Sequence, residues 1–151
     1  GAAAAALAAG VDRALSDLTR ASRLGGEPHA ARALAWRGFV LLKLGAPKRA
    51  ARDIQAALRR LPREGVFRAW LAQARAAAGD ESAARAEFSR ALKAPSAAFL
   101  DAYLARAGLN ERAGRWEEAR DDFETALLVD AKSRAARTGL ERAERARCAG
   151  K

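Results

Sequence analysis

The chain has 151 residues, half of them hydrophobic but only 6% aromatic, which suits one domain or a quasi-linear array of small repeated units. Strong helix formers dominate, and there is neither an alternating valine- or isoleucine-rich run nor an apolar run of about 18 residues, which excludes a β-rich fold and a membrane-spanning segment. The net charge of +10 bears on anionic partners rather than on the fold, and a single cysteine excludes an intrachain disulfide. We therefore expect an all-α chain.

Proline and glycine residues divide the chain into helices of about 12 to 16 residues joined by short turns, because proline is tolerated where a helix starts and glycine where one ends. At the N-terminus we predict a break at Gly10, which makes 2–9 the end of one helix and 11–24 the next. The remaining helices are predicted at 30–44, 47–60, 65–78, 81–93, 97–113, 116–129 and 133–147. Ser133 is expected to cap the last helix through its hydroxyl oxygen.

The sequence repeats itself with a period of 34 to 35 residues. Gly45, Gly79 and Gly114 are 34 and 35 residues apart. After each glycine comes an alanine, then a large apolar residue, then a second alanine, at spacings of three and four that form one stripe of a helix. These stripes are Ala50, Ile54 and Ala57; Ala84, Phe88 and Ala91; and Ala119, Phe123 and Ala126.

A two-helix unit that recurs every 34 residues in this way resembles the tetratricopeptide repeat. The resemblance implies a right-handed superhelix (α-solenoid) of antiparallel helix pairs, in which the first helices line a concave groove and the second helices form the convex face. As a single domain over 1–151, it implies a partial unit at 1–30, repeats at 31–64, 65–99 and 100–133, and a capping helix at 134–147.

The chain departs from that family pattern at three places. Pro47 and Glu81 replace an aromatic residue in the first two units, and Ala131 replaces the proline that ends the third. Pentatricopeptide repeats, which read RNA, have nearly the same period. The recurring glycine and alanine anchors favour the tetratricopeptide pattern instead.

The family resemblance implies that a protein or peptide partner binds in the concave groove. Trp36 and Trp70 hold the same place in consecutive units, 34 residues apart, so we expect the two indoles to be neighbours. Tryptophan serves both as a binding anchor and as a packing residue, and both roles stay open here. The lysine and asparagine side chains with which some relatives clamp chaperone tails are absent. The candidate groove residues are Arg32, Trp36, Phe39, Lys43, Trp70, Gln73, Glu111 and Arg112.

A second candidate surface is basic. Residues 1–110 carry 18 Lys or Arg against 9 Asp or Glu, residues 111–130 carry 3 against 7, and residues 131–151 carry 7 against 2. An anionic partner, either nucleic acid or an acidic protein, is the alternative that this pattern suggests, although ordinary solvated arginines are the favoured explanation. The residues are Lys48, Arg49, Arg52, Arg59, Arg60 and Arg63, in a run that continues to Arg68 and Arg75.

Acidic residues gather in the second helix of the third unit. We expect Glu117, Glu118, Asp121, Asp122 and Glu124 to form a solvated face, because charge runs on helices usually do so. They lack the fixed offsets and turn glycine of a calcium loop. A contact to the basic segment 134–147 of a neighbouring copy is the alternative.

Nothing in the sequence suits catalysis, a cofactor or a metal. His29 is the sole histidine and lies in a predicted turn, far from Cys148, so no acid, base or nucleophile has a partner. We predict a non-catalytic protein-interaction scaffold, with the basic surface or self-association through the terminal helix at 2–9 as alternatives. The single cysteine is compatible with a reducing compartment such as the cytoplasm, and the alanines at 2–6 lack the basic flank of a signal peptide.

Overall fold

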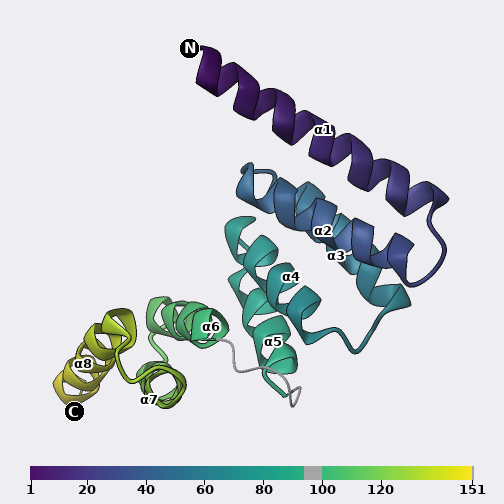
Figure 1. The fold of residues 1–151 in the computed structure, drawn as a ribbon. Helices are drawn as coiled ribbons and strands as arrows, with labels where there is room; N and C mark the ends of the chain where they lie inside the picture. The colour runs from purple at the N-terminus through teal and green to yellow at the C-terminus, as the bar shows by residue number, and fades with distance from the viewer. Residues whose placement is uncertain (94–99, 151) are drawn as a thin grey trace.

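The computed structural model describes residues 1–93 and 100–150, which form eight α-helices. Each helix packs against the one before it, and the helices stack in chain order so that the two termini lie at opposite ends of the stack (Figure 1). The predicted all-α solenoid is therefore confirmed. The helices are α1 (Ala2–Leu24), α2 (His29–Lys43), α3 (Pro47–Arg60), α4 (Gly65–Ala77), α5 (Glu81–Ala91), α6 (Leu100–Arg112), α7 (Trp116–Val129) and α8 (Arg134–Ala149).

The helix bounds predicted from the sequence agree with the structure to within about two residues from α2 onward. The start of the helix predicted at 97–113 lies outside the described residues, which show α6 from Leu100. The predicted cap at Ser133 is confirmed, because its hydroxyl oxygen accepts a hydrogen bond from the Ala136 N–H at 3.3 Å.

Three turns between paired helices share one geometry. Gly45, Gly79 and Gly114 have φ angles of 76°, 90° and 70°, a region that only glycine enters without a Cβ clash. The residue after each glycine donates its N–H to a carbonyl five residues back, as Ala46 does to Leu41 at 2.9 Å. The recurring glycine thus ends each first helix and turns the chain back along it.

The core is a row of small clusters rather than one centre. Ile54 and Phe88 are completely buried, and Phe123 is 3% exposed. Each lies among alanines of its own helix pair and apolar side chains of the neighbouring pair. Because no cluster includes residues from both ends of the chain, stability is a sum of local interfaces.

The predicted helix break at Gly10 is wrong. The chain from Ala2 to Leu24 is one helix of 23 residues, because a glycine within a helix costs only about 1 kcal/mol and the alanines around it favour helix strongly. Residues 2–10 are all exposed, and this part of α1 extends past α2 and α3 (Figure 1). The segment 2–9 is therefore part of α1 and not a separate helix, while self-association through the terminal helices stays a prediction.

Candidate functional site

Four aromatic side chains of α2 and α4 form one cluster. The ring centroids of Trp36 and Trp70 are 4.9 Å apart, Phe39 lies 4.6 Å from Trp70, and Phe67 lies 5.5 Å from Trp70. Phe67 is buried and Phe39 and Trp70 are half-buried, whereas Trp36 is 49% exposed. The expected contact between the two indoles is confirmed. The base of this aromatic cluster packs between helices, and one ring faces solvent.

A positive charge lies at the edge of the aromatic cluster. The Lys43 Nζ is 5.2 Å from the centroid of the Phe39 ring, within the range of a cation–π interaction. Arg32 lies about one helical turn before Trp36 on α2 and makes a long ion pair of 3.8 Å with Glu64. The cluster therefore offers an apolar surface bordered by cationic side chains.

A hollow of about 290 Å³ lies between α4, α5 and α6, and Gln73 in its lining follows Trp70 by three residues on α4. Gln73 and Arg112, two of the predicted groove residues, supply polar atoms to its lining. Arg112 is held there by an ion pair of 2.7 Å with Glu81. The hollow is lined by Gln73, Ala76, Phe88, Leu104, Ala105, Gly108, Leu109 and Arg112.

Glu111 is occupied by an interaction within the chain. Its carboxylate accepts two hydrogen bonds from Arg142 of α8, at 3.2 and 2.9 Å, and this raises the pKa of Arg142. Of the predicted groove residues, the structure thus brings Trp36, Phe39, Lys43 and Trp70 into one cluster, places Gln73 and Arg112 at the adjoining hollow, and ties Arg32 and Glu111 into ion pairs.

The second candidate surface follows α3 and the turn after it. All six of its predicted residues are exposed, and Arg60 pairs with Glu27 at 3.1 Å. Arg68 and Arg75, which the sequence suggested as a continuation of this run, lie instead against the buried Glu87 at 3.3 and 3.4 Å. The basic surface therefore consists of Lys48, Arg49, Arg52, Arg59, Arg60 and Arg63.

No protein-family model matches the sequence, and no curated protein sequence matches it either. Solved structures do match. MamA superposes with a TM-score of 0.81 at 17% identity, over 91% of this chain and 78% of that one. A tetratricopeptide repeat protein from Parabacteroides merdae gives 0.79 at 22%, over 91% and 54%. The first such domain of Spaghetti (RPAP3), bound to the HSP90 peptide SRMEEVD, gives 0.73 at 20%, over 78% and 93%. This chain has the tetratricopeptide-repeat fold.

Each of the three tetratricopeptide units places one carboxylate of its second helix against arginines of its first. These carboxylates are Asp53, Glu87 and Asp122, separated by 34 and 35 residues. Arg37 donates two hydrogen bonds to Asp53, at 2.7 and 2.9 Å, and Arg106 forms the equivalent pair with Asp122. The hydrogen bonds that Arg37 donates to Asp53 raise the pKa of the Arg37 guanidinium above its ordinary value.

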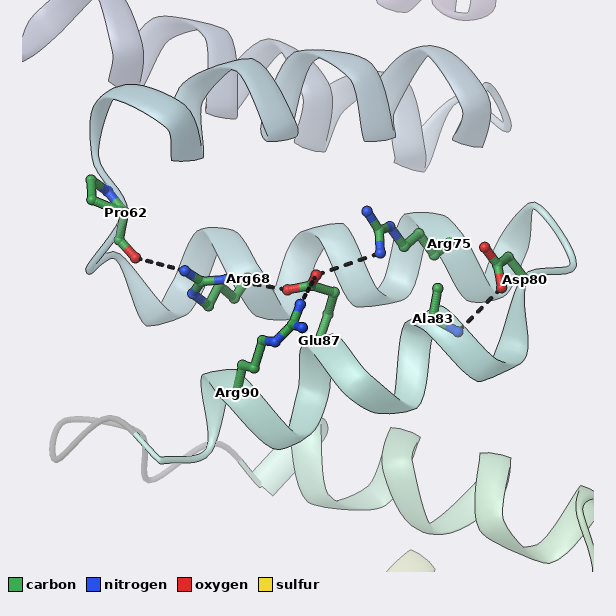
Figure 2. Close-up of polar contacts among 7 residues, drawn as sticks. All are labelled: Pro62, Arg68, Arg75, Asp80, Ala83, Glu87 and Arg90. Carbon is green, nitrogen blue, oxygen red and sulfur yellow. Dashed lines mark hydrogen bonds and ion pairs between the residues drawn. The ribbon is translucent and has the colours of Figure 1, made fainter.

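Glu87 holds the middle unit of the tetratricopeptide stack together. It is 4% exposed and accepts hydrogen bonds from Arg68, Arg75 and Arg90 at 3.3, 3.4 and 2.9 Å (Figure 2). Arg68 also donates to the carbonyl of Pro62 at 3.0 Å (Figure 2). Because two of these arginines belong to α4, the contacts fix the helix that carries Trp70.

The burial of these carboxylates was not predicted from the sequence. Asp122 was predicted to be solvated, but it is 3% exposed and also accepts a hydrogen bond from Asn110 at 3.3 Å. The available signal was the register, because an acidic residue recurs at one place in every tetratricopeptide unit. A solvated face gives no reason for such a recurrence.

The other acidic residues of α7 are exposed, as predicted, and they pair within the chain. Arg120 lies within 3.3 Å of Glu117, 2.6 Å of Asp121 and 3.6 Å of Glu124. Glu117 also pairs with Arg147 of α8 at 3.3 Å. The basic partner suggested for a neighbouring copy is thus supplied by the same chain.

The residues considered for catalysis lie far apart in the tetratricopeptide stack. His29 begins α2 and is exposed, and Cys148 is exposed near the end of α8. Across 1–93 and 100–150, no three histidine, cysteine, aspartate or glutamate side chains lie close enough together to hold a metal ion. Within the same ranges, none of the helices combines the length and the apolar character needed to cross a bilayer.

Proposed function

We propose that the chain is a non-catalytic scaffold that binds a peptide or a segment of another protein in the groove formed by α2, α4 and α6. The groove side chains are those of the aromatic cluster and the adjoining hollow. We also retain as a proposal the division into repeats at 31–64, 65–99 and 100–133, with a partial unit before them and a capping helix after.

The observation that carries this proposal is the exposure of Trp36. An indole that only packs between helices would be covered, yet 49% of Trp36 is exposed, beside the rings of Phe39 and Trp70. Rigid, partly exposed aromatic side chains held by a packed base are frequent binding anchors. A solved neighbour with the same fold is bound to the HSP90 peptide SRMEEVD, which agrees with a peptide-sized ligand.

The adjoining hollow gives the partner a second contact. If one side chain of the ligand packs on Trp36, the next apolar side chain of the ligand would enter the space beside Gly108. A polar or acidic ligand residue beyond it would face Arg112. The aromatic cluster and this hollow together suit an extended or helical segment with two apolar side chains.

The test is a selection of peptides from a random library against the full chain, followed by affinity measurement on the Trp36→Ala variant. We expect the affinity of the selected peptides to fall at least about thirtyfold, as for a central aromatic anchor. Because Trp36 is half exposed, its loss should lower the melting temperature only slightly, and circular dichroism measures this on the same sample.

Leu128→Ala is the matched control. Leu128 is 87% exposed on α7, outside the proposed groove, so its removal should leave peptide affinity unchanged. The proposal is wrong if no selected peptide depends on Trp36, or if Trp36→Ala and Leu128→Ala weaken binding equally. A large loss of melting temperature without loss of affinity would assign the indole to packing.

A further inference from the structure

Two hollows occupy equivalent places in the first and third units. One of about 280 Å³ lies between α1, α2 and α3, and the other of about 500 Å³ lies between α5, α6 and α7. Both contain an arginine–aspartate pair, Arg37 with Asp53 and Arg106 with Asp122. The second pair follows the first by 69 residues, which is two repeat periods. The same frame, three helices around an arginine–aspartate pair, therefore occurs twice in the chain.

The rims of the two hollows differ in charge at two equivalent positions, while Arg85 and Arg115 also line the second. The first is lined by Arg49 and Arg52. The residues 69 positions later, Glu118 and Asp121, line the second. The difference lies only in side chains added to a common frame, because the helices and the buried pair correspond. The third unit is thus an internal comparison for the first.

The two rim arginines of the first hollow have no carboxylate partner among the described residues, whereas at the second hollow this holds for Arg85 alone. Asp53 directs both carboxylate oxygens at Arg37. Neither Arg49 nor Arg52 makes an ion pair within 4.0 Å with any carboxylate of residues 1–93 and 100–150. In the second hollow, by contrast, Glu118 and Asp121 lie 4.0 and 2.6 Å from arginines of the same chain. The first hollow therefore has the more cationic lining.

Further cations extend this charge along α3. Lys48, Arg52 and Arg59 are four and seven residues apart, which places them within about 40° of one another around the helix and along about 16 Å of its length. All three are exposed. Lys48 and Arg59, like the rim arginines Arg49 and Arg52, have no ion-pair partner among the residues that the structure describes. These three cations, together with Arg49 and Arg63, form one basic face of five side chains.

We propose that this basic face binds the phosphate backbone of duplex nucleic acid, with one phosphate held between Arg49 and Arg52 at the mouth of the hollow. Guanidinium groups bind phosphate oxygens in a bidentate manner, and most backbone contacts need no apolar side chain. Binding of this kind is independent of base sequence. It uses a surface separate from the groove and does not rest on the function proposed above.

The surroundings of the basic face favour this occupant over a protein. An acidic protein partner would need apolar anchors for affinity, and of the large apolar side chains exposed in the described ranges none lies on α3. The face also carries no aromatic ring on which unpaired bases could stack, which favours a duplex over a single strand. A second copy is disfavoured because the acidic residues of α7 are already paired within the chain.

The test measures fluorescence anisotropy of a labelled duplex of about 20 base pairs with the full chain over a series of salt concentrations. We expect binding at about 50 mM salt, with log affinity falling against log salt at a slope of about −3 to −4, as for four phosphate contacts. Two duplexes of unrelated sequence should bind equally. Absence of binding at that salt concentration overturns the proposal.

The decisive variant is Arg49→Glu with Arg52→Asp, which installs the residues that the third unit carries at the same places. That unit already accommodates them on the same frame, and thermal melting checks that the variant folds. We expect at least a tenfold loss of duplex affinity and a salt slope smaller by about two.

The matched control is Arg134→Glu with Arg137→Glu, which changes the net charge equally on exposed positions of α8. It should weaken duplex binding less than about threefold, since it alters only the long-range field. An equal loss in both variants would overturn the proposal by assigning binding to net charge alone. Equal competition by polyglutamate of matched charge would overturn it in favour of an acidic protein.

Discussion

At the scale of single residues, two glycines of the first helices differ in what surrounds them. A Cβ at Gly38 would lie 2.5 Å from the Ile54 Cγ1 and 2.9 Å from the backbone oxygen of Ala50. A Cβ at Gly108 would meet only the end of the Arg112 side chain, at 3.8 Å. The close approach of α2 and α3 thus requires a glycine, whereas α6 has room for a side chain.

These surroundings predict opposite effects of the same substitution. Gly38→Ala should lower the free energy of unfolding by about 1 to 3 kcal/mol, because the core is overpacked. Gly108→Ala should raise it by up to about 1 kcal/mol, because alanine favours the helix and nothing must move. Urea denaturation of both variants measures the difference, and shifts of the same sign would contradict the packing described here.

Glu87 gives a second prediction at this scale. Glu87→Gln keeps the side-chain volume but removes the charge that three arginines share, and we expect a loss of about 2 kcal/mol in unfolding free energy. This is less than for a fully buried pair, because the arginines are partly solvated. Glu124→Gln, at an exposed ion pair on α7, is the control and should change stability by less than about 0.5 kcal/mol.

At the scale of whole helices, glycine marked most boundaries correctly but failed once. Gly45, Gly79 and Gly114 end helices because the following helix packs back against the one before, and the positive φ is needed for that return. Gly10 has the same local chemistry, yet no helix turns back there. The sequence pattern within a few residues does not distinguish these cases, since the difference is made by distant packing.

The exposed start of α1 predicts that it contributes little to stability. Removal of residues 1–9 should lower the melting temperature by no more than about 2 °C, because residues 2–10 cover no core. Leu15→Ala, which alters a side chain packed against the cluster of Leu41 and Ala50, should cost more. Thermal melting followed by circular dichroism compares the two, and a larger loss from the truncation would mean that the segment is packed in solution.

At the scale of the whole molecule, the row of separate core clusters predicts that damage stays local. Ile54→Ala removes a completely buried side chain and should cost about 2 to 5 kcal/mol. Because each unit contacts only its neighbours, hydrogen exchange should quicken in α2, α3 and α4 and change little in α7 and α8. Uniform loss of protection along the chain would instead indicate a single cooperative core.

The repeat period also explains how far the candidate site was predictable. Trp36 and Trp70 share a register position, and a common register places side chains of neighbouring units together, so their contact followed from the sequence. Glu111 and Arg142 share no such relation, because α8 stands outside the repeats and meets α6 only through the fold. Arg68 and Arg75 were misassigned for a related reason, since their partner Glu87 belongs to the next helix and its burial depends on packing.

Cys148 has a practical consequence for single-molecule and surface-based experiments. It is the one cysteine in the sequence, its side chain is exposed on the last helix, and that helix lies at the end of the stack opposite α1 (Figure 1). A maleimide dye or a biotin linker would therefore attach at a single known point. Molecules tethered through it would all present α2 and α3 away from the support, in a uniform orientation and without any engineered tag.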